Sequence, residues 1–262
     1  MTAEPMAARA MADGSKNAGK QKPPPPMPVD DAHFAYIRAN LIATFYHEFA
    51  HALIDLLVLP VLGQEEDAAD ILSVLMLNMD FRGEELEQLA RDAARAFRAD
   101  AIDREENDQP WAWADEHGPE WQRYYNFVCL HFGAAPDLRR VFAETMGLPE
   151  ARAGICPDEF MLASRSWGFA LARVKKGAPG ESIRFRSHAR RHLHKRAAAT
   201  IHAAVKRLNR SYVLPKQLRV IVKHCRDDSP LSAFYTPDRI SITVCTEYID
   251  DLLHQARTAG SL

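Results

Sequence analysis

The longest apolar stretch of the sequence, residues 41–62, is interrupted by four ionisable side chains: His47, Glu48, His51 and Asp55. A membrane-spanning helix would have to take all four into hydrocarbon, which is too costly. Apolar residues recur at helical spacing over residues 34–56, and Pro60 followed by Gly63 ends the pattern. The stretch therefore predicts a long buried helix with polar groups inside it.

Residues 46–51, Tyr-His-Glu-Phe-Ala-His, contain an HExxH motif. On a helix, His47 and His51 are one turn apart on the same face, so both imidazoles can bind one metal ion. Glu48 lies beside them and can accept a proton from metal-bound water. The alternative is a hydrogen-bonded pair of core histidines. We favour the metal, because a divalent cation compensates the desolvation of these groups in an apolar helix.

A catalytic zinc ion needs a third protein ligand and an open fourth position. The acidic run at residues 64–70 follows a Pro and Gly turn that would fold a second helix back on the first. Glu66 and Asp70 share one face of this helix in an ExxAD pattern. We therefore predict Glu66 as the third ligand and Asp70 as the acceptor of a ligand histidine's second ring N–H.

Three further acids lie near these residues. Glu65 and Asp67 point elsewhere on the helix, and we interpret them as N-terminal acids that interact favourably with the helix dipole rather than as ligands. Asp55 is one turn past His51, which makes it a lesser candidate for supporting a ligand histidine.

The remaining periodicity predicts an α+β fold that is predominantly α, with a zincin-like HExxH helix packed on the ExxAD helix and a small β-sheet from the C-terminal segment. Residues 1–29 are expected to be a disordered Pro-rich tail, and residues 30–262 a single domain that is helical over 30–210 with a small sheet plus helix over 211–258. The expected helices after the first are residues 65–78, 84–100, 119–132, 136–147, 158–174, 187–209 and 246–256, and the expected strands are 218–223 and 239–244.

Charge is balanced in total but not along the chain. The 33 Lys and Arg against 35 Asp and Glu give a net charge of -2, yet residues 183–226 hold thirteen Lys or Arg and no acid, and residues 65–120 hold seventeen acids and five Arg. The basic block motivates an alternative function, a nucleic-acid-binding or regulatory protein. Against it, the block has few aromatic residues to stack on bases and no recognition motif, and much of it fits one solvated helix face.

The cysteines and the N-terminus are less informative about function than the HExxH and ExxAD motifs. Cys129, Cys156, Cys225 and Cys245 are too few for a disulfide scaffold and lack CxxC spacing, so free thiols and one or two disulfides both stay open. The N-terminus has no secretory apolar region, so a cytoplasmic location is expected by default, although the four cysteines would permit disulfides on export.

Residues 47–70, HEFAHALIDLLVLPVLGQEEDAAD, resemble the core of a bacterial family of unknown function described as "putative metallopeptidases", in which HExxH is followed by P-x-x-G-x-EEDAAD. The resemblance continues through residues 114–117, 122–126, 147–150, 214–215, 233–235 and 245–248 and the four cysteines. In that family the strand segment precedes the HExxH helix, so the resemblance implies that this chain is circularly permuted. It also suggests pairing Cys129 with Cys156 and Cys225 with Cys245.

The same resemblance bears on the site. The ExxAD element is also similar to the third-ligand helix of membrane-embedded HExxH peptidases, which favours Glu66 over Glu65. The matching loop and helix contain candidates for the oxyanion donor that peptide hydrolysis needs besides the metal: His117, Arg123, Tyr124 and Tyr125. The alternatives for these are an exposed loop histidine, an ion-paired arginine and packed tyrosines.

The resulting functional prediction is a zinc-dependent metallopeptidase that hydrolyses a protein or peptide substrate with a Glu48-activated, metal-bound water. Its Zn²⁺ would be bound by His47, His51 and Glu66, and His117 and Tyr124 would assist Glu48. A catalytically inactive metallopeptidase-like fold, in which the metal is only structural, is the other alternative. A fourth side chain in the position of the water would favour it.

Overall fold

The computed structural model describes residues 29–109, 113, 115–175, 181–225 and 232–258, so the predicted tail lies almost entirely outside the described residues. In chain order the elements are α1 (Asp31–Leu57), α2 (Glu65–Asp80), α3 (Gly83–Glu106), α4 (Glu120–Gly133), α5 (Arg140–Thr145), α6 (Glu150–Ala153), α7 (Cys156–Ala172), β1 (Ile183–Ser187), α8 (His192–Ser211), β2 (Leu218–Lys223), β3 (Ala233–Thr236), the 3-10 turn η1 (Pro237–Arg239), β4 (Ser241–Cys245) and α9 (Thr246–Thr258).

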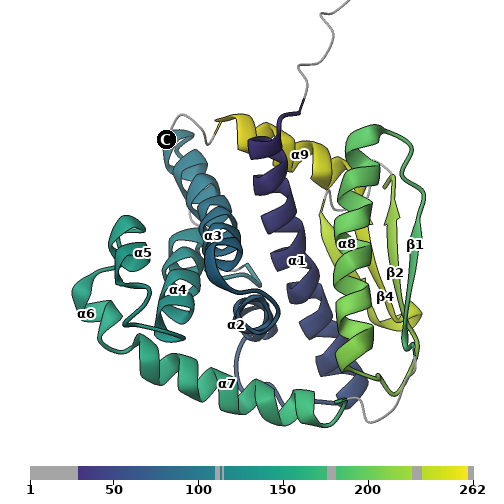
Figure 1. Ribbon diagram of the computed structural model, residues 1–262, viewed down its shortest axis with the longest axis horizontal. Helices are drawn as coiled ribbons and strands as arrows, with labels where there is room; N and C mark the ends of the chain where they lie inside the picture. The colour runs from purple at the N-terminus through teal and green to yellow at the C-terminus, as the bar shows by residue number, and fades with distance from the viewer. Residues whose placement is uncertain (1–28, 110–112, 114, 176–180, 226–231, 259–262) are drawn as a thin grey trace, which may run out of the picture.

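Helix α1 runs through the middle of the molecule (Figure 1). It contacts α2 and α3 on one side and α8, α9, β3 and β4 on the other. Its N-terminus is capped by the Asp30 side chain, which accepts the His33 backbone N–H at 2.8 Å, and it ends at Val58, whose backbone is left-handed. Because neighbours surround it, α1 buries residues on all sides, which accounts for its near-continuous apolar sequence.

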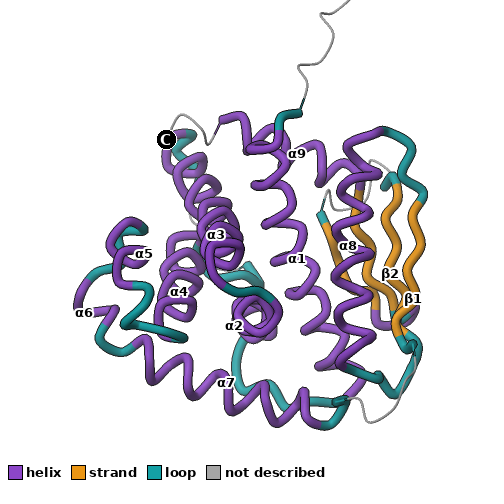
Figure 2. Tube along the Cα trace, viewed as in Figure 1, coloured by secondary structure: helices purple, strands orange, loops and turns teal. Residues whose placement is uncertain are grey.

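The helices α2 to α7 and the sheet lie on opposite sides of α1 (Figure 2). The strand order is β1-β2-β4-β3, with β1, β2 and β4 parallel and β3 antiparallel at one edge. In β2 the apolar residues Leu218, Val220 and Val222 are buried and alternate with more exposed ones, as expected for a sheet covered by helices on one face. One hydrophobic cluster extends from α1 to α9. The fold is therefore α+β and predominantly helical, as the sequence predicts.

The structure corrects several predicted elements. The sheet has four strands instead of two, because residues 183–187 pair with β2 and residues 233–236 pair with β4. The former open the basic block just before the helix predicted over residues 187–209, and the ring of Phe185 stacks on His202 of α8, with centroids 4.7 Å apart. Helix α3 extends beyond the predicted residue 100, and the helix predicted at 136–147 shrinks to α5.

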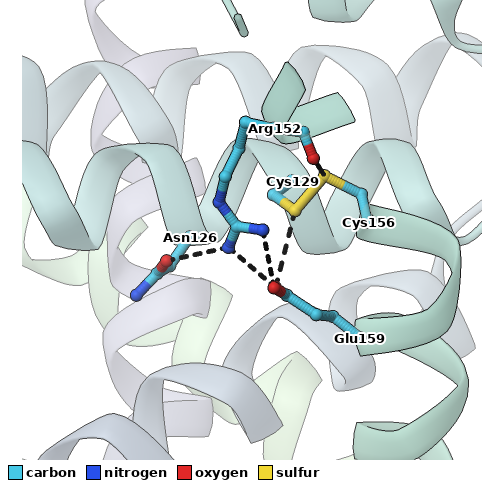
Figure 3. The surroundings of a disulfide bond; sticks show 5 residues. All are labelled: Asn126, Cys129, Arg152, Cys156 and Glu159. Atoms are coloured by element: carbon cyan, nitrogen blue, oxygen red, sulfur yellow. Dashed lines mark hydrogen bonds and ion pairs between the residues drawn. A yellow bond between two sulfur atoms is a disulfide. The ribbon is translucent and has the colours of Figure 1, made fainter. Parts of the chain in front are cut away.

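Two disulfides join segments that are distant in the chain, Cys129 to Cys156 and Cys225 to Cys245, the pairs that the family resemblance suggests. The first connects α4 to the start of α7, beside an ion pair of Arg152 with Glu159 (Figure 3). The Arg152 guanidinium also donates to the Asn126 side chain at 3.1 Å, so one cation links α4, α6 and α7.

Part of the basic block has structural partners. Arg191 pairs with Asp250 of α9 at 2.7 Å, and Arg196 pairs with Asp31 and lies over the ring of Phe34. These contacts fix α8 against the ends of α1 and α9. Among the described residues, no helix combines the length and the apolar character that a membrane-spanning segment requires.

We predict that Gly133→Ala destabilises the protein by roughly 1–3 kcal/mol or more, the cost of overpacking a core. A Cβ at Gly133 would lie 2.2 Å from the backbone oxygen of Cys156, so the disulfide-linked ends of α4 and α7 would have to separate. Gly168→Ala is the matched control, because that position in α7 has open space. It should instead stabilise the helix by about 0.5–1 kcal/mol. Urea unfolding measures both, and equal effects would contradict this packing.

Candidate metal centre

Three side chains from α1 and α2 converge at one point. His47 and His51 are one helical turn apart on α1, and Glu66 comes from the first turn of α2. The Nε2 atoms of the two histidines are 3.2 Å apart, and Glu66 Oε2 lies 3.0 Å from His47 Nε2 and 3.4 Å from His51 Nε2. The ligand atoms of this group all lie within 4.8 Å of one another. The structure thus brings together the three residues that the sequence predicts as ligands.

The chemistry and spacing of these atoms fit a zinc ion. Donor atoms about 2.0–2.1 Å from one tetrahedral zinc are roughly 3.3 Å apart, and the three separations lie near that value. Glu66 Oε2 is buried and has no partner in hydrogen-bond geometry, although imidazole nitrogens surround it. A buried carboxylate oxygen in this state requires a compensating charge. A cation shared with the two imidazoles supplies it.

A carboxylate supports each of the two histidines. His47 Nδ1 donates to Asp70 at 2.8 Å, as predicted for Asp70, and His51 Nδ1 donates to Glu65 at 2.7 Å. With a metal ion bound, these bonds would leave both Nε2 lone pairs free to coordinate it, which is the tautomer that metal binding needs. Glu65 thus supports a predicted ligand histidine, whereas its sequence position predicts only an interaction with the helix dipole.

Asp70 is held in place by Arg123 of α4, which donates to both carboxylate oxygens at 2.7 and 3.0 Å. Burial opposes ionisation of Asp70, but Arg123 and His47 hold its pKa well below the usual range. Burial likewise lowers the pKa of His47, but the hydrogen bond to Asp70 and the contact with the Glu66 carboxylate more than offset it and raise that pKa to about 10. The acidic surroundings therefore favour positive charge at this point, which a metal cation or protons can provide.

Glu48 is buried beside the centre on α1. Burial raises the pKa of its carboxyl to about 6, against the lowering effect of His47 and His51. The carboxylate also accepts a hydrogen bond from the Tyr235 backbone N–H, so strand β3 fixes its position. A carboxyl with this pKa is suited to accept and return a proton near neutral pH.

Asp55 does not contact either histidine in the described contacts. Its carboxylate accepts the Tyr235 hydroxyl at 2.6 Å, so it ties β3 to the exposed side of α1. Tyr235 therefore bridges α1 twice, through its backbone to Glu48 and through its side chain to Asp55. The predicted role of Asp55 beside a ligand histidine is corrected to one in positioning the edge strand.

His117 reaches the centre from the segment between α3 and α4. Its Nε2 lies 2.9 Å from Glu66 Oε2, and its ring stacks on that of His47 with centroids 6.1 Å apart. Burial of the Glu66 carboxyl opposes ionisation, but contacts with His117, His47 and His51 hold its pKa far below the usual range. The predicted site residue His117 is thus in direct contact with a predicted ligand.

Tyr124 does not reach this centre, contrary to its predicted catalytic role. Its ring is buried and its hydroxyl donates to the Met146 carbonyl at 2.6 Å, so it faces α5 and supports that region. Tyr125 packs against Trp121 of the same helix. The tyrosines that line the centre are instead Tyr235 and Tyr248, and the hydroxyl of Tyr248 lies 2.8 Å from that of Thr44.

The predicted ligands, Glu48, Tyr235 and Tyr248 line a cleft of about 700 Å³. His47, His51, Glu66 and Glu48 form one wall, and β3, Phe97 and Tyr248 form others. The cleft is large enough for several residues of an extended peptide.

Fold and site together define an α+β protein with a His-His-Glu group that could hold a metal ion in a cleft. The chain belongs to the family described as "Putative metallopeptidase", whose model matches residues 8–171. The matched segment contains the whole HExxH helix and the ExxAD helix. No match was found among curated proteins or among solved structures. The circular permutation of the C-terminal segment stays a prediction, since residues 172–262 lie outside the match, and the zincin-like likeness stays a prediction, since no solved structure matches.

We predict that Asp70→Asn weakens zinc binding about 10- to 100-fold, the usual cost of losing the hydrogen-bond acceptor of a ligand histidine. The amide keeps one acceptor oxygen but loses the negative charge and the second acceptor with which Asp70 supports His47 and pairs with Arg123. The control is Glu84→Gln at the exposed start of α3, which should leave the affinity unchanged. Competition with a chromophoric zinc chelator measures both, and equal affinities of the two variants would contradict this role for Asp70.

We also predict that Tyr235→Phe lowers the free energy of unfolding by roughly 0.5–1 kcal/mol, because Asp55 is exposed and water replaces part of the lost hydrogen bond. A double-mutant cycle with Asp55→Ala isolates the pairwise contribution. A coupling free energy of zero would show that the hydroxyl does not hold β3 to α1 in solution.

Proposed function

We propose that this protein is a zinc-dependent peptidase, in which His47, His51 and Glu66 bind the metal and Glu48 acts as general base and acid. The observation that carries the proposal is the convergence of the three ligand atoms within 4.8 Å, next to the buried Glu48. Zinc bound in such a group lowers the pKa of a water molecule and polarises the scissile carbonyl. Membership of a family described as "Putative metallopeptidase" supports the reaction class.

Glu48 takes a proton from the attacking water and later delivers it to the leaving amine. Its raised pKa, near 6, suits both transfers, because the carboxylate is ionised at neutral pH yet basic enough to hold the proton transiently. The Tyr235 N–H holds the carboxylate while leaving the other lone pairs free to face the cleft. Asp70 and Glu65 keep the two histidines in the tautomer with free Nε2 lone pairs.

Strand β3 offers a docking edge for an extended substrate. The Cys245 backbone N–H donates to the Ser232 carbonyl, which makes these two residues a hydrogen-bonded pair of the antiparallel ladder. Such pairs alternate, so Ala233 and Tyr235 direct their backbone polar groups away from β4 and toward the cleft. Because the Tyr235 N–H is already bonded to Glu48, a peptide that adds to this edge would pair with the backbone of Ala233 and the Tyr235 carbonyl as it runs past Glu48.

The basic block supports the nucleic-acid alternative less well. Arg191 and Arg196 are engaged in ion pairs within the protein, and Arg207 lies over the ring of Phe81 at 4.4 Å. These contacts give the block a role in holding α8 to α1, to α9 and to Phe81 at the end of α2. The peptidase proposal remains the one that accounts for the buried polar groups of α1.

The proposal is tested with Glu48→Gln, which should keep zinc and lose cleavage. Zinc content by atomic spectroscopy and hydrolysis of a proteome-derived peptide library are measured on the same preparations. The amide cannot accept the proton, and losing a general base costs about 10²- to 10⁴-fold in rate. The matched control, Glu84→Gln at the exposed start of α3, should equal the wild type in both measurements. A wild-type protein that binds no zinc, or unchanged cleavage by Glu48→Gln, would refute the proposal.

A further inference from the structure

A second group of metal-binding side chains lies where β2 and β4 end. Cys225, Cys245 and Glu247 each offer one ligand atom, and these atoms lie within 4.8 Å of one another. None of the three residues lines the cleft of the first centre. Two thiolates and a carboxylate are ligands that zinc accepts. The two cysteines are joined by a disulfide, so this group binds a metal only after that bond is broken.

The fold brings the three side chains together at the carboxyl ends of two parallel strands. Lys223 at the end of β2 pairs with Cys245 at the end of β4, and Cys225 follows two residues after Lys223. Helix α9 begins directly after β4, so Glu247 stands in its first turn. The carboxyl ends of parallel strands are a common place for ligand sites.

The Glu247 carboxylate is anchored through one oxygen only. Its Oε2 accepts the Cys225 backbone N–H at 3.1 Å and the Thr246 hydroxyl at 3.3 Å. Its Oε1 is buried and has no partner in hydrogen-bond geometry among the described residues. Oε1 contacts the His224 imidazole, but that side chain is 78% exposed and can turn into water. A buried carboxylate oxygen in this state is stabilised by a bound cation.

The other disulfide also has an acid beside it, but that acid is already paired. Glu159 lies 3.6 Å from Cys129 Sγ, and the Arg152 guanidinium donates to both of its oxygens at 2.6 and 2.7 Å (Figure 3). Within the described segments, Cys129 and Cys156 belong to no group of ligand atoms that could hold a metal ion. Reduction of the two disulfides would therefore have different consequences.

We propose that Cys225, Cys245 and Glu247 form a second metal site, for Zn²⁺ or a similar divalent cation, that exists only when the disulfide is reduced. A dithiol breaks the S–S bond, is itself oxidised to a disulfide and leaves two protein thiols. The metal displaces one proton from each thiol and binds both thiolates and the Glu247 carboxylate. Disulfide and metal use the same two sulfur atoms, so the two states exclude each other.

The backbone already holds the cysteines at a suitable separation. Their Cα atoms are 5.4 Å apart. Bonded sulfurs lie about 2.0 Å apart, whereas a zinc ion about 2.3 Å from each sulfur keeps them about 3.8 Å apart. Rotation about the two Cα–Cβ bonds can provide this change. The inference does not depend on the proposed function, because it uses no residue of the first centre.

The decisive experiment is a titration of the whole protein with Co²⁺ before and after reduction by a water-soluble phosphine. With water, the phosphine converts each disulfide to two thiols and becomes the phosphine oxide. Thiolate-to-cobalt charge-transfer absorption should appear only in the reduced protein. The His47, His51 and Glu66 centre has no sulfur ligand and cannot produce this absorption. Zinc analysis of the same preparations should show one additional ion for each reduced chain.

Matched variants assign the site. The pair Cys225→Ala and Cys245→Ala should lose the absorption after reduction, whereas the pair Cys129→Ala and Cys156→Ala should keep it. Glu247→Gln should weaken Co²⁺ binding to the reduced protein by at least about tenfold, the lower end of the cost of disturbing a metal-ligand arrangement. Its control, Glu159→Gln beside the other disulfide, should leave that affinity unchanged.

Thiol titration verifies reduction, and circular dichroism with Co²⁺ present verifies folding. A reduced, folded protein without the absorption would overturn the inference. The same holds if the absorption survives removal of Cys225 and Cys245, or if reduction unfolds the protein even with Co²⁺ present. Failure of the proposed function would be seen separately, as an absence of zinc from the oxidised protein.

Discussion

The structure depends on the burial of two imidazoles and a carboxyl in its central helix. α1 contacts helices on one side and strands on the other, so its polar residues are largely shielded from water and face only the cleft. They are stabilised only by groups that other elements supply: Glu66, Asp70 and Glu65 from α2, and the Tyr235 backbone from β3. The packing of α2 and β3 on α1 therefore also assembles the site. If the same surfaces packed without these partner groups, the buried imidazoles and carboxyl of α1 would be desolvated and uncompensated.

The opposed charge blocks follow from the same architecture. The acids at the N-terminal end of α2 contact the histidines of the centre. Asp80, at the C-terminal end of α2, accepts a hydrogen bond from the Tyr46 hydroxyl and faces Arg207 and Arg210 of α8. α2 thus connects the centre with the basic block through its two ends. The near-zero net charge is the sum of two regions with different roles. Acids surround the cleft, and part of the basic block holds α8 against neighbouring helices.

Much of the helical framework could be predicted from the sequence, because helical periodicity is local. The ends of α1 and α2 agree with their Pro, Gly and acidic signals to within a few residues. β3 was not predictable in the same way, since four residues at a sheet edge carry too little periodicity and pair with β4 only through the tertiary fold. Tyr124 was predicted at the centre, whereas the structure places Tyr248 there, and this difference has a similar cause. Both are tyrosines on helices, and only helix packing decides which ring faces the cleft.

The sequence by itself determined the pair of histidines on one helical face, the adjacent glutamate and the acidic helix that follows a tight turn. These depend on spacings of one or a few residues, which the geometry of the α-helix converts directly into positions in space. The tertiary structure alone decided that Glu65 supports His51, that Tyr235 holds Glu48, and that His117 closes on Glu66. Those contacts join residues from different elements, and their geometry depends on how the whole core packs, which no local spacing encodes.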